Sequence, residues 1–169
     1  MINTKEILSE LNLKEDMSGA EFGCGAAHFA LDLAKKLSKG TVYALDIQEE
    51  KLSALRGKVA LEKLHNVRTI LCDLENEQGS TLHTGSLDVI LIPNVLFQSE
   101  NRTAIMKEAQ RVLKKGGELL VIDWQKQGSF HKETIVSPDE IKKIAQTLGL
   151  RLKKERGAGE YHYALFFVK

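Results

Sequence analysis

Residues 87–92, Leu-Asp-Val-Ile-Leu-Ile, form a nearly continuous apolar run in the middle of the chain. Such a run is typical of a strand buried on both faces, and strands of this kind occur in parallel sheets that helices cover on both sides. Other stretches that favour strands alternate with stretches of helical periodicity along the sequence. The run therefore predicts an α/β fold built on a doubly wound, mostly parallel sheet.

Glycine, proline and capping residues set the expected limits of seven strands and five helices. The expected strands are residues 19–22, 41–46, 67–72, 87–92, 118–123, 150–155 and 161–168. The expected helices are residues 3–13, 27–37, 49–64 and 101–114, with a fifth that begins at Ser137 and ends at Gly149. The turn Gly157-Ala158-Gly159 predicts that the last two strands form an antiparallel hairpin, so that the final strand is reversed.

The length of 169 residues fits one domain, which we expect to span residues 1–169. Within it, residues 1–16 are expected to form an N-terminal cover helix and residues 125–136 a short lid segment. Lys and Arg number 24 against 23 Asp and Glu, a balance that argues against binding of DNA or a membrane surface by bulk charge. Two cysteines make no disulfide framework, and no signal-peptide pattern or membrane-length apolar run is present, so a cytoplasmic location is expected.

A glycine-rich segment, Glu21-Phe22-Gly23-Cys24-Gly25-Ala26-Ala27, lies where the first strand turns into a helix. Glycines there let the backbone approach a ligand closely, and the helix N-terminus offers free N–H donors. Asp46 ends the second strand and can accept hydrogen bonds from a ribose diol, and Asp73 follows the third. Because ligands of such sheets bind at the carboxyl ends of the strands, these acids predict a nucleotide-like ligand.

The same segment argues against a dinucleotide. The dinucleotide motif needs a third small residue where this chain has His28, and the Glu21 carboxylate would repel a pyrophosphate. A glutamate at this place suits a cationic ligand, such as a sulfonium that carries an ammonium group. A nicotinamide-dependent oxidoreductase is therefore disfavoured.

Five motifs resemble those of class I S-adenosylmethionine-dependent methyltransferases. They are Glu21 to Ala27, Val-Tyr-Ala-Leu-Asp at 42–46, Cys-Asp-Leu at 72–74, Asp-Val-Ile-Leu-Ile-Pro-Asn-Val-Leu-Phe at 88–97, and the segment 111–124 that ends Val-Ile-Asp-Trp. The resemblance covers nearly the whole chain and is closest to the small-molecule branch that includes the ubiquinone and menaquinone methyltransferases. It implies a Rossmann-like fold, S-adenosylmethionine as cofactor and methyltransferase activity.

The resemblance also implies roles for individual residues at the cofactor site. Glu21 and the loop of Gly23, Cys24 and Gly25 would hold the methionine part, Asp46 the ribose hydroxyls, Ile47 and Asp73 the adenine ring and its amino group, the Leu74 backbone the ring edge, and Asn94 the floor near the methyl group.

Parallel topology places further side chains beside the transferred methyl group. Phe97, Gln98, Trp124 and Tyr163 are candidate substrate contacts. Tyr161 and His162 are candidate catalytic residues, with His162 a possible base, although ordinary strand aromatics would also account for this stretch. A base is needed only when the acceptor must lose a proton, because aligning the reactants can itself supply about 7–11 kcal/mol. No metal is expected, since the pair His131 and Glu133 has no third ligand at a suitable spacing.

The leading hypothesis is methyl transfer to a small-molecule acceptor by in-line displacement, without nucleic acid as substrate; whether a protein partner exists stays open. An RNA or protein methyltransferase is an alternative, because residues 86–169 carry 14 basic and 10 acidic side chains. Six of the basic residues crowd the last helix and the sixth strand, where a solvated face is the competing interpretation: Lys142, Lys143, Arg151, Lys153, Lys154 and Arg156. A second alternative is a non-catalytic subunit that binds S-adenosylmethionine for a partner enzyme.

Overall fold

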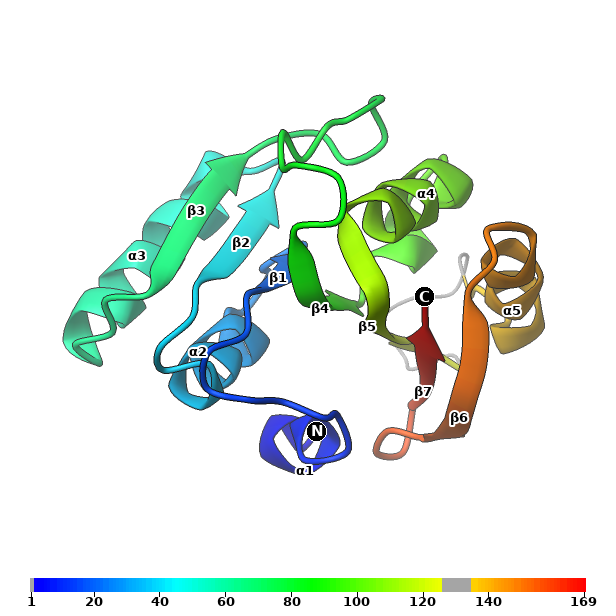
Figure 1. Cartoon of the computed structure of the whole chain (residues 1–169), viewed down its shortest axis with the longest axis horizontal. Helices are drawn as coiled ribbons and strands as arrows, with labels where there is room; N and C mark the ends of the chain where they lie inside the picture. The colour runs from blue at the N-terminus through cyan, green and yellow to red at the C-terminus, as the bar shows by residue number, and fades with distance from the viewer. Residues whose placement is uncertain (1, 126–134) are drawn as a thin grey trace.

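A seven-stranded sheet forms the centre of the computed structural model, which describes residues 2–125 and 135–169 (Figure 1). The strands are β1 (Gly19–Phe22), β2 (Val42–Asp46), β3 (Val67–Leu71), β4 (Leu87–Pro93), β5 (Leu113–Trp124), β6 (Arg151–Gly157) and β7 (His162–Val168). Their order is β3-β2-β1-β4-β5-β7-β6. The pairs among β1 to β5 are parallel, whereas β7 runs antiparallel to both β5 and β6. The expected Rossmann-like α/β fold with a reversed last strand is thus confirmed.

Helices cover both faces of this sheet. They are α1 (Thr4–Leu8), α2 (His28–Lys36), α3 (Glu49–Leu61), the 3-10 turn η1 (Leu96–Gln98), α4 (Arg102–Val112) and α5 (Pro138–Thr147). Helices α4 and α5 pack on one face, and α1, α2 and α3 pack on the other (Figure 1). Among the described helices, none has both the length and the apolar character that crossing a membrane requires.

The two faces explain why the central strands are apolar without alternation. On β5, Leu119 and Val121 belong to the core beneath α4 and α5, whereas Leu120 and Ile122 belong to the core beneath α1 and α2. Successive side chains of a strand point to opposite faces, so each face of β5 meets its own layer of helices. The prediction made from residues 87–92 is confirmed in the same way by β4.

Three of the expected helices were too long at their C-terminal ends: α1, α3 (which ends at Leu61, not residue 64) and α4. The ends of α1 and α4 show why. The first helix ends at Leu8: the Glu10 N–H donates only three residues back, to Ile7, and the Asn12 N–H donates to the Glu118 carboxylate (2.7 Å) instead of continuing the helix. Helix α4 ends at Val112, and Leu113 already pairs with Leu87 of β4. Strand β5 therefore starts five residues before the expected position, 118. In both cases a tertiary hydrogen-bond partner outweighs local helix propensity.

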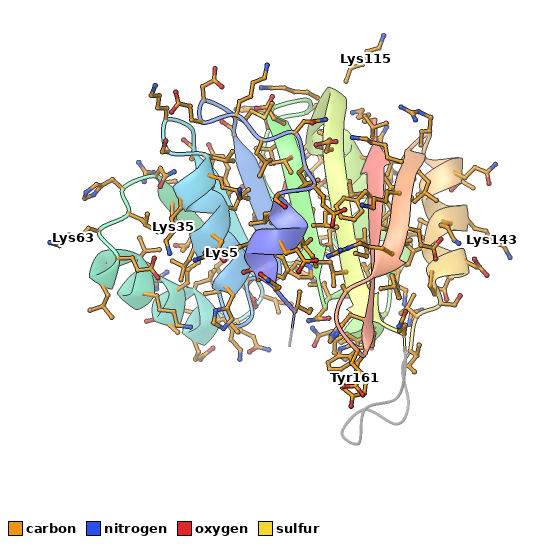
Figure 2. All side chains as sticks on the ribbon, turned by 90° about the horizontal axis from the view of Figure 1, so that it is seen from below. Lys5, Lys35, Lys63, Lys115, Lys143 and Tyr161 are labelled. Carbon is orange, nitrogen blue, oxygen red and sulfur yellow. The ribbon has the colours of Figure 1, made fainter. Side chains whose placement is uncertain are left out.

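Helix α1 lies across the sheet (Figure 2). Apolar packing holds one side of it and ion pairs hold the other. Asn3 caps it by accepting from the Glu6 N–H (3.2 Å), and Ile7 and Leu8 are buried in the core beneath it. The Glu6 carboxylate pairs with Arg156 of β6 (2.9 Å), and Glu10, just beyond the helix, also pairs with Arg156 (3.1 Å). The first helix and the closing hairpin are therefore neighbours in space.

Candidate functional site

A cavity of about 1020 Å³ lies at the carboxyl ends of β1, β2, β3 and β4. This volume is at the upper end of the roughly 300–1,000 Å³ usual for small-molecule sites. The structure brings all nine predicted cofactor-binding residues to its wall: Glu21, Gly23, Cys24, Gly25, Asp46, Ile47, Asp73, Leu74 and Asn94. Residues 2–5, at the start of α1, line the cavity from the other side.

The glycine loop bends sharply between β1 and α2. Gly23 has φ +78°, and a Cβ placed there would lie 2.3 Å from Cγ2 of Val95. Ala27 also adopts a left-handed conformation, with φ +70°, at the position just before α2. The Gly23 N–H donates to the Leu45 carbonyl of β2 (2.7 Å), which fixes the loop beside the neighbouring strand. Glycine at position 23 is required by both backbone conformation and space.

Two glycine substitutions are expected to change stability in opposite directions. Gly23→Ala should lower the free energy of unfolding by about 2–4 kcal/mol, because the Cβ meets a stiff valine at a strained φ. Gly57→Ala on the exposed face of α3 should raise it by about 0.5–1 kcal/mol, since no heavy atom lies within 4 Å of the added Cβ. Urea unfolding followed by circular dichroism measures both changes. Equal stability of Gly23→Ala and the unmodified protein would contradict this account of the loop.

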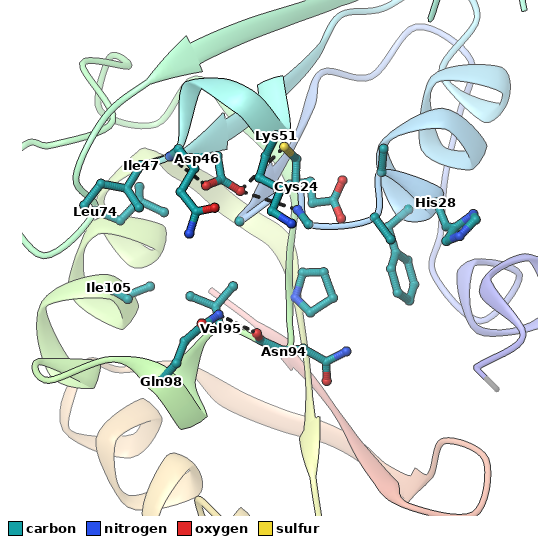
Figure 3. A pocket seen from close by; sticks show the side chains of 18 of the residues that line it. Cys24, His28, Asp46, Ile47, Lys51, Leu74, Asn94, Val95, Gln98 and Ile105 are labelled. Carbon is teal, nitrogen blue, oxygen red and sulfur yellow. Dashed lines mark hydrogen bonds between the residues drawn. The ribbon is translucent and has the colours of Figure 1, made fainter. Parts of the chain in front are cut away.

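Asp46 joins the glycine loop to the end of β2 (Figure 3). Its carboxylate accepts the Gln48 N–H (3.0 Å) and the Gly25 N–H (3.4 Å), and the Cys24 thiol lies 3.6 Å from it. Burial and the Asp46 charge raise the pKa of the Cys24 thiol to about 12, so that this thiol stays protonated and is a poor nucleophile. Ile47 beside it is 64% exposed, which leaves an apolar surface free for a flat ring.

Glu21 is the most unusual polar group of the cavity wall. Its side chain is 2% exposed, and its Oε2 atom has no hydrogen-bond partner among the described residues. Burial raises the pKa of this carboxyl well above its ordinary value, and the nearby Asp46 charge raises it further. A buried carboxyl oxygen without a partner is costly, and a cation bound in the cavity would satisfy it.

Glu75 supports the site, and the sequence did not indicate it. The Asp73 carboxylate accepts the Glu75 N–H (2.9 Å), which shapes the loop after β3. The Glu75 carboxylate in turn accepts from the Ser99 hydroxyl (2.7 Å) and from the Asn101 N–H (3.1 Å), just before α4. Glu75 and Asn101 are 26 residues apart, so this hydrogen bond produces no short-range sequence motif. Motif spacing could therefore not have identified Glu75.

An aromatic group forms the far end of the cavity. Trp124 of β5 and His162 of β7 are paired in register, with ring centroids 4.0 Å apart, and both line the cavity. Phe97 meets Trp124 edge-on at 6.5 Å. Gln98 also lines the cavity and donates to the Asn94 carbonyl (3.1 Å; Figure 3). We call Trp124, His162, Phe97 and Gln98 the aromatic wall.

His162 is suited to accept a proton. It is 9% exposed, and burial lowers the pKa of its imidazole below the ordinary value, so the ring is neutral at pH 7. Its Nε2 atom has no hydrogen-bond partner within residues 2–125 and 135–169. The ring lines the cavity beside Trp124, and its Nε2 atom is buried.

Three predicted substrate or catalytic residues do not line the cavity. Phe97 reaches it only through its contact with Trp124. Tyr161 is 39% exposed at the outer end of the hairpin (Figure 2). Tyr163 is paired in register with Asp123 and lies in the core with residues of α4 and α5, because adjacent strand residues point to opposite faces. The placement of Tyr161 and Tyr163 therefore does not support a contact with the acceptor.

Most of the expected lid falls outside the described part of the chain. Residues 126–134, with His131 and Glu133, are not described. Within the described residues, no group of three or more His, Cys, Asp and Glu side chains is arranged to hold a metal ion.

A family model for a methyltransferase domain matches residues 13–161. The chain belongs to this family. The resemblance to class I S-adenosylmethionine-dependent methyltransferases is thereby confirmed, and the match covers β1 to β6 and stops just before β7, which begins at His162.

Curated methyltransferases match this chain at just under 30% sequence identity. A demethylmenaquinone methyltransferase of Listeria monocytogenes is 29% identical over 70% of this chain and 49% of its own length. A ubiquinone/menaquinone biosynthesis C-methyltransferase of Campylobacter jejuni is 28% identical over 89% of this chain and 63% of its own length. The chain thus spans about half the length of the first of these relatives and under two thirds of the second.

Solved structures agree with the fold. The crystal structure of a SAM-dependent methyltransferase from Aquifex aeolicus superimposes with a TM-score of 0.86 and 26% identity, covering 98% of this chain and 89% of that one. A geranyl diphosphate methyltransferase in complex with SAM has a TM-score of 0.82 at 9% identity, covering 98% of this chain and 76% of that one. The second likeness concerns the fold alone.

Proposed function

We propose that this methyltransferase domain binds S-adenosylmethionine in the cavity and catalyses transfer of its methyl group to a small-molecule acceptor. The observation that carries the proposal is the buried Glu21 carboxyl, whose Oε2 atom has no partner among the described residues, beside a glycine loop in which the Gly25 N–H donates to Asp46. The ammonium group of a bound amino acid would supply the missing partner of Glu21, and a ribose diol would donate to the Asp46 carboxylate. The bound cofactor supplies a methyl group already activated on a sulfonium.

The chain's own residues hold and orient the two reactants. Glu21 and residues 23–25 hold the methionine part, Asp46 the ribose, and Ile47, Asp73 and Leu74 the adenine, while Asn94 lines the floor. The start of helix α1 covers the cavity. Exclusion of water and alignment of the reactants provide most of the rate enhancement in such a displacement.

The proposed acceptor is a planar aromatic compound that carries a hydroxyl group. The names of the relatives point to quinone compounds, and the aromatic wall offers ring faces and edges for stacking. His162 would accept the hydroxyl proton as the methyl group is transferred, an effect typically worth 10²–10⁴-fold in rate.

An RNA acceptor is less well supported by the charges of the C-terminal half. Four of its six clustered basic side chains are paired with carboxylates: Lys142 with Asp139 and Glu155, Lys153 with Glu118, Lys154 with Glu10, and Arg156 with Glu6 and Glu10. Paired charges release few counterions from a polyanion and therefore contribute little to its binding.

Calorimetry tests the cofactor, and a turnover assay tests the reaction. We expect S-adenosylmethionine and S-adenosylhomocysteine to bind with one site per chain, and NAD to give no heat. Formation of S-adenosylhomocysteine with 1,4-dihydroxynaphthalene, kept reduced under argon, then reports methyl transfer. Binding of NAD in place of S-adenosylhomocysteine would refute the cofactor assignment, and tight cofactor binding without turnover on any acceptor would favour the non-catalytic subunit.

A further inference from the structure

Asp123 is a fully buried carboxylate at the end of β5, and it points away from the cavity. Its side chain is 0% exposed. It lies on the face covered by α4 and α5, beside its register partner Tyr163, whereas Trp124, the next residue, lines the cavity. The sequence marked Trp124 and Tyr163 as site residues but gave no role to Asp123, which precedes the first and pairs with the second.

The Asp123 carboxylate joins two separate segments of the aromatic wall. One oxygen accepts the Trp124 N–H (2.8 Å) and the other accepts the Phe97 N–H in η1 (3.1 Å). The backbone of β5 and the turn that follows β4 thus donate to the same carboxylate, although Phe97 and Asp123 are 26 residues apart in sequence. A third hydrogen bond holds η1 to α4, because the Nε of Arg102 donates to the Leu96 carbonyl at the start of η1 (2.8 Å).

A buried charge at this place is costly for folding, so packing alone does not account for it. Burial raises the pKa of Asp123 to about 6, whereas its backbone hydrogen bonds and the charge of Arg102 act in the opposite direction. Both oxygens accept N–H groups, which is the arrangement that an ionised carboxylate makes. An apolar residue would fill this part of the core at lower cost, but it would leave two N–H groups without their acceptor.

We propose that Asp123 is a positioning residue that fixes Trp124 and η1 relative to each other and thereby shapes the surface against which the methyl acceptor lies. This inference rests on the proposed function for the identity of the acceptor. The geometry of the wall itself can be measured without any acceptor.

The test uses Asp123→Asn and the chain's single tryptophan, Trp124. An amide has one acceptor oxygen where the carboxylate has two, so one of the two N–H groups loses its partner. We expect a red-shifted Trp124 emission, because the indole is freed from its contact with His162. We also expect the KM for 1,4-dihydroxynaphthalene to rise about tenfold, as for loss of one hydrogen bond, with kcat and the Kd for S-adenosylhomocysteine changed less than about threefold.

Glu118→Gln is the matched control. Glu118 is a buried carboxylate on the same strand and accepts the Asn12 N–H, but it lies in the middle of β5 and does not line the cavity. This variant should keep the emission of Trp124 and the KM of the unmodified protein. An equal emission shift in both variants would show that loss of any buried carboxylate of β5 loosens the fold, and it would overturn the proposal.

Asp123→Ser serves if the asparagine variant does not fold, since it removes the charge and leaves one acceptor. An unchanged Trp124 emission together with an unchanged KM in a folded variant at position 123 would also overturn the proposal. Failure of the unmodified protein to bind S-adenosylhomocysteine refutes the proposed function instead. The emission comparison between positions 123 and 118 still decides whether Asp123 fixes the wall.

Discussion

Replacing Asp46 with alanine is expected to lower the affinity for S-adenosylhomocysteine by at least about 100-fold. Two hydrogen bonds from a ribose diol to a carboxylate are lost, and hydrogen bonds to charged groups are worth about 1.5–3 kcal/mol each. The Gly25 and Gln48 N–H groups also lose their acceptor, so the glycine loop becomes less ordered. Isothermal titration calorimetry measures the change.

Asp88→Ala provides the control for that experiment. Asp88 lies on β4, accepts the Ser18 N–H (2.9 Å) and pairs with Lys114 (2.8 Å), at the end of the sheet remote from the cavity. The control should lose some stability and keep its affinity for S-adenosylhomocysteine. Wild-type affinity in a folded Asp46→Ala variant would remove this residue from the cofactor site.

Glu21→Gln is expected to weaken cofactor binding by about 10–100-fold and, in the absence of ligand, to raise the melting temperature. The first effect follows from loss of a carboxylate that pairs with the cofactor's ammonium group. The second follows because an amide removes the cost of ionising a buried acid at neutral pH. Calorimetry and differential scanning fluorimetry on the same samples measure both effects.

The pH dependence of stability has a definite sign for Glu21. The pKa of its carboxyl is raised in the folded protein above the ordinary 4.5, so the unfolded chain releases this proton first as the pH rises. The free energy of unfolding therefore falls with pH between 4.5 and the raised pKa, and this decline should be missing in Glu21→Gln. Cofactor affinity in the unmodified protein should rise over the same range, because the cation needs the ionised carboxylate.

Glu108→Gln is the opposite case and serves as control. Burial opposes ionisation of Glu108, but hydrogen bonds from Arg111 and Ser80 outweigh it and lower the pKa of this carboxyl. Its contribution to stability is present above the ordinary pKa of 4.5 and is lost as the pH falls through the lowered value. Glu108→Gln should therefore melt at a lower temperature without loss of cofactor affinity. A fall in melting temperature for both variants would contradict the assignment of Glu21 as a buried acid whose ionisation destabilises the folded protein.

The cofactor end of the cavity could be predicted because its residues are local to strand ends. Each of Glu21, Asp46 and Asp73 lies at or just after the carboxyl end of a strand, and parallel topology alone brings such positions to one edge. The reversed strand followed from the glycine turn at 157–159. The order of helices and strands needed no tertiary information beyond these patterns.

The acceptor end could not be predicted residue by residue, because both faces of β7 are apolar. Phe166 and Phe167 are equally buried in opposite cores, so alternation of apolar and polar residues does not show which face is turned to the cavity. A shift of one residue exchanges His162 and Tyr163 between the two faces. The roles of Asp123 and Glu75 depend on hydrogen bonds across 26 residues each, which appear only once the chain is folded.

The fastening of α1 to β6 has a kinetic consequence. The first residues of α1 line the cavity, and its buried side chains Ile7 and Leu8 anchor it to the core. On its outer side, Glu6 forms an ion pair with Arg156 of β6. Added salt weakens exposed ion pairs and leaves apolar anchoring intact, since the Debye length falls to about 3 Å at 1 M. The dissociation rate of S-adenosylhomocysteine should then rise with ionic strength, while the midpoint of urea unfolding stays nearly constant. In that case the ion pairs between α1 and the closing hairpin would set the lifetime of the bound product.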